Sequence, residues 1–80
     1  MELIYQTQYF IVYETYYPKR KTPILNIVSK DGSELGEIKW FGRWRKFCYY
    51  PYSNTVWDNK CLTNLVTFLN EYNSKWRSIK

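Results

Sequence analysis

Short runs of β-branched and aromatic residues, separated by polar or proline-containing breaks, fill the first two thirds of the chain. Such runs favour extended strands, because branched and aromatic side chains pack well on a pleated surface. Whether the first strand begins earlier, near Leu3, stays open. The pattern predicts four strands, over residues 8–14, 24–29, 34–41 and 44–50.

The breaks between these runs have the chemistry of loops and turns. Two prolines and three consecutive cations between Tyr16 and Pro23 predict an exposed loop, since proline lacks the N–H that a central strand donates. Asp31-Gly32 suits a hairpin turn because glycine tolerates positive φ, and Gly42 marks another tight reversal. Consecutive strands joined by such short turns pair antiparallel.

After residue 58 the spacing of apolar residues changes to that of a helix. Intervals of three and four residues place the apolar side chains on one helical face. Asp58 or Asn59 can cap the start by accepting a backbone N–H. We expect a helix over about residues 60–76 and a frayed tail over 77–80. The apolar positions, of which the three leucines are expected in the core, are Leu62, Leu65, Val66, Leu69, Tyr72 and Trp76.

Together these elements predict an α+β fold: an antiparallel β-meander of about four strands packed by one C-terminal helix, in a single domain over residues 1–80. Both faces of the last two strands carry rings, because alternate residues point to opposite sides. One helix covers one face only. Some aromatic residues must therefore be exposed, covered by the N-terminal segment, or buried against a partner.

Composition restricts the interpretation further. A domain of 80 residues has a marginal core, so an aromatic content of 21% serves folding first. The formal net charge of +5 favours acidic partners. The N-terminus lacks a basic leader, and no apolar run approaches the ~20 residues of a membrane span, so we expect a soluble intracellular protein without membrane contact. Cys48 and Cys61 are then expected to be reduced, while whether a disulfide, which would close a short loop, joins them stays open.

The sequence has no catalytic or metal-binding signature. It contains no histidine, no phosphate-binding glycine loop and only two cysteines, too few to close a zinc site. Glu34 and Glu37 stand three apart in a predicted strand and so point to opposite faces. We expect neither enzymatic activity nor a metal or cofactor.

The segment from Ile38 to Tyr52 combines seven aromatic rings with four cations and no acid, and Trp57 follows shortly after. Rings interleaved with cations suit a surface that stacks on bases and neutralises phosphates. A sheet with rings inward and cations outward explains the pattern as well, as does a cation–π pair of Arg43 or Arg45 with a tryptophan. Phe41, Phe47 and Tyr49 are the expected exposed rings. The candidate binding residues are Lys39, Phe41, Arg43, Arg45, Lys46, Phe47 and Tyr49, with Lys19, Arg20 and Lys21 in the basic loop.

The C-terminal half carries a resemblance. W-F-G-R-W-R-K-F, then Y-Y-P, Thr55 and C-L-T-N-L-V-T-F-L-N resemble a group of small phage and prophage proteins. Those proteins share a W-x-G-x-W-R-x-[YF] strand-turn-strand, an aromatic-proline step and a Cys-Leu helix start. The resemblance implies a phage or mobile-element origin, a place in the host cytoplasm and action by stoichiometric binding.

Two functions therefore remain as hypotheses. The first is contact with single-stranded nucleic acid through the aromatic and basic hairpin. The second is a protein-binding inhibitor or adaptor acting on a host enzyme or defence complex, since Tyr, Trp and Arg dominate interface hot spots. Either function is compatible with a monomer or a homodimer.

Overall fold

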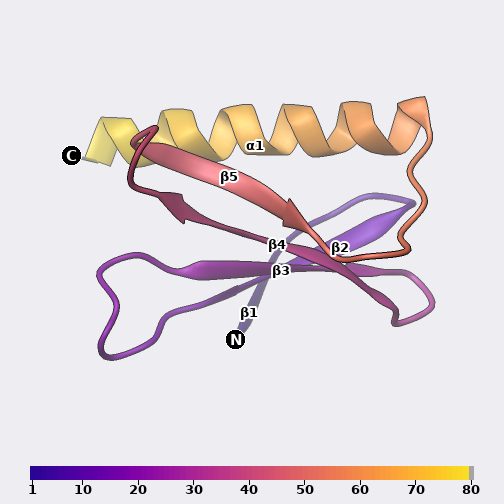
Figure 1. The fold of residues 1–80 in the computed structure, drawn as a ribbon, viewed down its shortest axis with the longest axis horizontal. Coiled ribbons are helices and arrows are strands. Elements are labelled where there is room, and N and C mark those ends of the chain that lie inside the picture. Colours follow the sequence, from indigo (N-terminus) through magenta and orange to yellow (C-terminus); the bar gives the residue numbers. More distant parts are fainter. Residues whose placement is uncertain (80) are drawn as a thin grey trace.

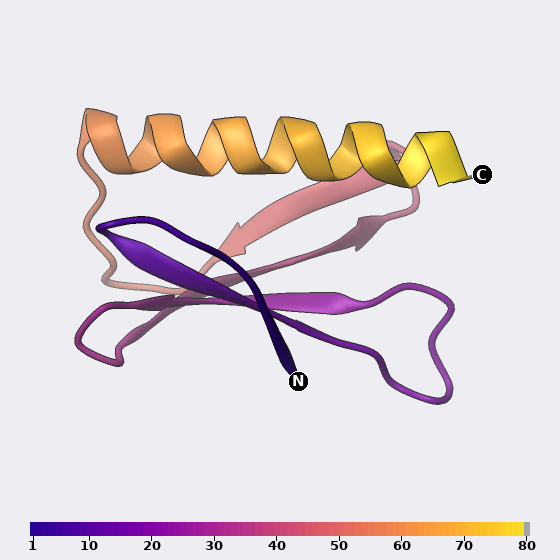
Figure 2. The same cartoon turned by 180° about the vertical axis from the view of Figure 1, so that it is seen from behind.

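The computed structural model describes residues 1–79 and shows two layers, an antiparallel sheet and one long helix across one of its faces (Figures 1 and 2). The α+β class and the C-terminal helix are confirmed, whereas the sheet has five strands instead of about four. The strands lie in sequence order, so that β1 and β5 form the two edges. The elements are β1 (Glu2–Gln6), β2 (Phe10–Thr15), β3 (Ile24–Ser29), β4 (Glu34–Phe41), β5 (Lys46–Pro51) and α1 (Asn59–Ile79).

The additional strand is β1, which pairs antiparallel with β2 and has a register shift between Leu3 and Tyr5. A tight turn joins the two strands. Thr7 accepts the N–H groups of Tyr9 and Phe10 on its hydroxyl oxygen, at 3.0 and 3.1 Å, and the N–H of Thr7 donates to the carbonyl of Phe10. The N-terminal segment thus extends the sheet edge.

The hairpin between β4 and β5 differs from the expectation. Phe41 pairs with Lys46, so β5 starts at Lys46 and not at residue 44. Residues 42–45 form the turn, in which Arg45 adopts a left-handed φ of 53° while Gly42 does not have a positive φ. At the β3–β4 turn, in contrast, Gly32 supplies the positive φ (98°) that the sequence predicts.

Helix α1 begins after Asp58, whose carboxylate accepts the N–H of Cys61 at 2.8 Å as an N-cap. The helix continues to Ile79, so the expected fraying from residue 77 is wrong for the part of the chain that the structure describes. Its buried side is also shifted. Leu65 and Phe68 are buried and Leu69 is partly buried against the core, but Leu62 is 45% exposed and lies outside the core.

The core lies between the sheet and the helix. It is sealed along β5 by Asn73, a buried polar side chain of α1. The N–H of Phe47 donates to Oδ1 of Asn73 at 2.8 Å, and Nδ2 of Asn73 donates to the carbonyl of Phe47 at 3.1 Å. The amide therefore bonds to the edge strand as a neighbouring strand would. The buried core residues are Phe10, Val12, Leu25, Ile27, Ile38, Phe47, Leu65 and Phe68.

Tyr72 joins the helix to the sheet at a second point. Its hydroxyl donates to a carboxylate oxygen of Glu14 on β2 at 2.6 Å. Burial, and then the hydrogen bond to the neighbouring Glu14 carboxylate, raises the pKa of the Tyr72 phenol well above its usual range. The folded state thus favours the protonated phenol more than the unfolded state does. This contribution to stability is complete below the unfolded pKa of about 10 and is lost as the pH rises above it.

We expect Tyr72→Phe to lower the free energy of unfolding by about 1–2 kcal/mol at neutral pH, because a hydrogen bond to a charged acceptor is lost. The variant should also lose less stability than the wild type between about pH 9 and pH 11. Urea unfolding across this range measures both effects. Tyr17→Phe, at an exposed ring, is the matched control and should unfold like the wild type. An unchanged alkaline decline in Tyr72→Phe would contradict this account.

Candidate nucleic-acid interface

The β4–β5 turn presents an indole to solvent. The N–H of Trp44 donates to the carbonyl of Phe41 at 3.2 Å, and the N–H of Arg45 donates to the carbonyl of Gly42 at 3.3 Å. These bonds close the turn with Trp44 at its tip, 63% exposed. The rings of Phe41 and Trp44 pack edge-on, with centroids 4.9 Å apart, so Phe41 supports the exposed indole.

Three cations lie within two residues of this indole in the sequence. Arg43, Arg45 and Lys46 are exposed, and none of them forms a salt bridge with the residues described, 1–79. The left-handed backbone of Arg45 costs about 1–2 kcal/mol relative to a relaxed conformation, since an arginine carries a Cβ that glycine lacks. Backbone strain of this kind concentrates at functional sites.

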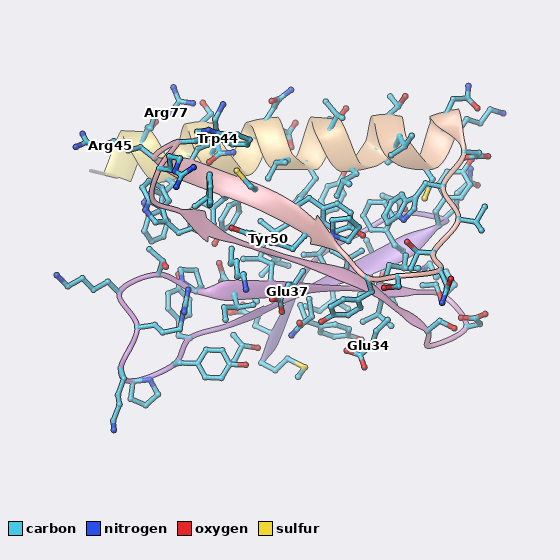
Figure 3. All side chains as sticks on the ribbon, in the orientation of Figure 1. Glu34, Glu37, Trp44, Arg45, Tyr50 and Arg77 are labelled. Carbon is cyan, nitrogen blue, oxygen red and sulfur yellow. The ribbon has the colours of Figure 1, made fainter. Side chains whose placement is uncertain are left out.

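A cleft of about 460 Å³ opens between the turn and the end of α1. Both of its tryptophans rest on the buried ring of Phe47, in edge contacts with centroids 5.4 Å (Trp40) and 5.1 Å (Trp76) apart. Figure 3 shows Arg45 and Arg77 at this same end of the molecule. We call it the tryptophan cleft; its lining residues are Trp40, Gly42, Arg45, Trp76 and Arg77.

A smaller hollow of about 180 Å³ is lined by Cys48 and by aromatic side chains, among them Trp44 of the turn. Lys39 stands beside it on β4, but its ammonium already has partners. Its Nζ lies 3.0 Å from a Glu37 carboxylate oxygen and 4.6 Å from the centroid of the Tyr50 ring. Lys39 is therefore less available to a ligand than Arg43 or Lys46.

The loop of residues 16–23 lies at the same end of the molecule as the β4–β5 turn and the C-terminus of α1, as both ribbon views show. An antiparallel meander requires this, because alternate connections fall at the same end of the sheet. The loop carries Lys19, Arg20 and Lys21, all exposed. Figure 3 shows Glu34 toward the opposite end. Glu14 and Glu2 lie nearer the loop, because burial and then these two carboxylates raise the pKa of the Tyr16 phenol. The basic end, as we call it, comprises Lys19, Arg20, Lys21, Arg43, Arg45, Lys46 and Arg77.

Two of the expected exposed rings are placed differently. Phe47 is 1% exposed, because its position on β5 faces the helix, so its expected exposure is wrong. Tyr49 faces the same way and is only partly exposed. Its hydroxyl donates to the carbonyl of Leu35 at 3.0 Å, and its ring contacts Trp57. Phe41 is half-buried beneath Trp44. Phe47 thus supports the site from within, through its contacts with Trp40 and Trp76, whereas the contacts of Tyr49 with Leu35 and Trp57 lie outside the site.

Five residues of the site were missed by the sequence prediction, namely Trp40, Gly42, Trp44, Trp76 and Arg77. Trp44 was assigned to a strand, where its indole would lie on the sheet and not at the tip of a turn. Arg77 was assigned to a frayed tail. One signal in the sequence indicated the turn: Gly42 and Lys46 are four residues apart, which is enough for a tight turn that contains Trp44.

Comparison with known proteins supports the expected phage origin. The chain is 36% identical over 66 residues to the "Uncharacterized 9.3 kDa protein" of Acholeplasma phage L2, an alignment that covers 81% of this chain and 85% of the phage protein. The chain belongs to the family of that phage protein. No protein-family model matches the chain, and no solved structure matches it.

Two other kinds of site were sought in the described part of the chain. Among residues 1–79, no three His, Cys, Asp or Glu side chains gather closely enough to hold a metal ion. Cys48 and Cys61 are free cysteines, and burial raises the pKa of the Cys61 thiol. Helix α1 lacks the run of apolar residues that crossing a membrane would need.

Proposed function

We propose that this protein is a non-enzymatic phage protein that binds single-stranded nucleic acid through its basic end. The observation that carries the proposal is the position of Trp44, an indole 63% exposed among cations without salt-bridge partners in the described chain. An exposed large ring does not contribute the stability of about 1.5–3 kcal/mol that its burial would provide, and a small domain has little stability in reserve. Stacking on a base would recover about 1–3 kcal/mol.

A single strand suits this surface better than a duplex. Stacking requires a base that is free of its neighbours, as it is in single strands and loops. A major groove admits an α-helix, but helix α1 lies flat across the sheet (Figure 1). The loop at residues 19–21 and the turn at residues 43–46 lie at one end of the molecule and can together follow a phosphate backbone.

The test is a fluorescence-anisotropy titration with labelled oligothymidylate and oligouridylate of about 16 nucleotides. If about five phosphates are contacted, the affinity should fall about a hundredfold between 50 and 200 mM salt, following the slope of −0.7 per phosphate for single strands. Trp44→Ala should weaken binding about tenfold or more. The absence of binding to either polymer at the lowest salt would overturn the proposal.

A charge-matched pair of double variants gives the control. Arg43→Ala/Lys46→Ala removes two cations beside Trp44, and should weaken binding and make the salt slope shallower by about 1.4. Lys30→Ala/Lys60→Ala removes the same charge from exposed positions outside the basic end and should change little. Equal losses in the two variants would mean that only net charge acts.

A protein partner is the second candidate function. Leu62 and Val66, one turn apart on α1, are 45% and 54% exposed and form a small apolar strip on the helix. Exposed apolar patches mark protein-interaction sites, so this strip favours a stoichiometric inhibitor or adaptor of a host protein. Affinity capture with and without nuclease separates the two functions, since nucleic-acid binding predicts that the partners are lost after nuclease treatment.

A further inference from the structure

We propose that the tryptophan cleft holds one unstacked nucleotide of the bound strand, with its base against the indoles and its phosphate at Arg45 and Arg77. This inference rests on the proposed function and adds a second contact to the stacking surface of Trp44. The volume of about 460 Å³ lies within the range of small-ligand pockets, about 300–1,000 Å³.

Packing within the protein holds the two indoles of the cleft in place without a ligand. Trp40 comes from β4 and Trp76 from α1, and both indoles contact the buried ring of Phe47 edge-on, at interplanar angles of 78° and 80°. Both the N–H and the carbonyl of Phe47 are in turn hydrogen-bonded to the side-chain amide of Asn73. A site held in this way loses little conformational freedom on binding, which favours affinity.

Two residues of the β4–β5 turn, Gly42 and Arg45, line the cleft, and neither is the residue type that would make the turn most stable. Arg45 occupies the left-handed conformation that glycine adopts without cost. Gly42 does not use a positive φ, and a Cβ added to it would meet no atom within 4 Å. Neither residue is explained by the fold alone. Both are explained if the cleft must stay open at residue 42 and cationic at residue 45.

The charges of the cleft indicate an anionic occupant. Among residues 1–79, its lining contains two guanidinium groups and no acidic side chain. The last turn of α1 contributes carbonyl groups whose partial negative charge opposes an anion. Arg77, the one basic residue of that turn, offsets this charge together with Arg45. Guanidinium groups bind phosphate oxygens through paired hydrogen bonds, and indoles stack on bases, so a nucleotide uses both features.

Two variants test the cleft with the labelled 16-mer oligothymidylate described above. Arg45→Gly removes the guanidinium and relaxes the backbone, so the thermal midpoint should rise by a few degrees while the affinity falls about tenfold. Gly42→Leu adds a side chain to the lining of the cleft, with a Cβ that meets no atom within 4 Å, so the midpoint should change little while the affinity falls about fivefold or more. Lys60→Ala, which also removes one cation, is the control.

The outcomes separate this inference from the proposed function. If both variants bind like the wild type while Trp44→Ala does not, the cleft holds no nucleotide, although the basic end still binds the strand. If Arg45→Gly lowers the thermal midpoint, Arg45 serves the fold and the argument from strain is wrong. If the wild type binds no oligonucleotide, the proposed function itself is wrong.

Discussion

Asn73→Leu should lower the free energy of unfolding by about 3 kcal/mol. The two side chains are similar in size, so packing is retained, but the N–H and the carbonyl of Phe47 both lose their partner. A buried backbone group without a hydrogen bond costs about 1–3 kcal/mol. Because both groups belong to one residue of an edge strand, the start of β5 should separate from α1 before the rest of the sheet unfolds.

Urea unfolding followed by tryptophan fluorescence measures this loss. Asn70→Leu, one turn earlier on α1 at an exposed position, is the matched control and should lie within about 0.5 kcal/mol of the wild type. Asn73→Asp keeps an acceptor for the N–H of Phe47 but loses the donor to its carbonyl, and should also be strongly destabilised. A loss below about 1 kcal/mol in Asn73→Leu would show that water replaces the amide.

Gly36→Ala should destabilise the protein by a similar amount, about 3 kcal/mol, at the upper end of the range for overpacked cores. A Cβ at Gly36 would lie 2.7 Å from the Tyr49 hydroxyl oxygen and 2.7 Å from the carbonyl oxygen of Tyr50. The second contact is with backbone, so it cannot be relieved by a side-chain rotation. Gly36 pairs with Pro51 across the two strands, and relief would require β4 and β5 to move apart.

Gly42→Ala is the matched control for this substitution. The same methyl group there meets no atom within 4 Å and no positive φ is required, so thermal unfolding should show a stability equal to the wild type or about 0.5 kcal/mol higher. If the two alanine variants unfold at the same midpoint, the close approach of Tyr49 to Gly36 is not a constraint on the fold.

The strands from β2 to β4 and the helix could be predicted because periodicity and turn chemistry agree there. β1 has the alternation of a strand, but its polar ends Glu2 and Gln6 weaken the signal. Its pairing with β2 therefore could not be established from local pattern. The helix face was shifted toward Leu62 because leucine spacing alone does not locate the buried side. Phe68 and Asn73, which the structure buries, complete that side.

The candidate site was predictable in composition and less so in geometry. Alternation along β5 correctly places Phe47 and Tyr49 on one face, but it does not say which face the helix covers. That choice depends on tertiary packing, and it turns Phe47 from an exposed ring into the support of two indoles. Trp76 and Arg77 join Arg45 only when the helix docks, so no local pattern could have associated them.

The free side of β5 has a consequence for behaviour at high protein concentration. An open strand edge is a template for pairing with other molecules, and natural proteins block it with covering side chains or with proline. Here the side-chain amide of Asn73 already bonds the N–H and the carbonyl of Phe47. Pro51, four residues further along β5 and facing the same edge, has no N–H to donate. Two positions along this edge are therefore blocked, which should lower the tendency of β5 to pair with strands of other copies.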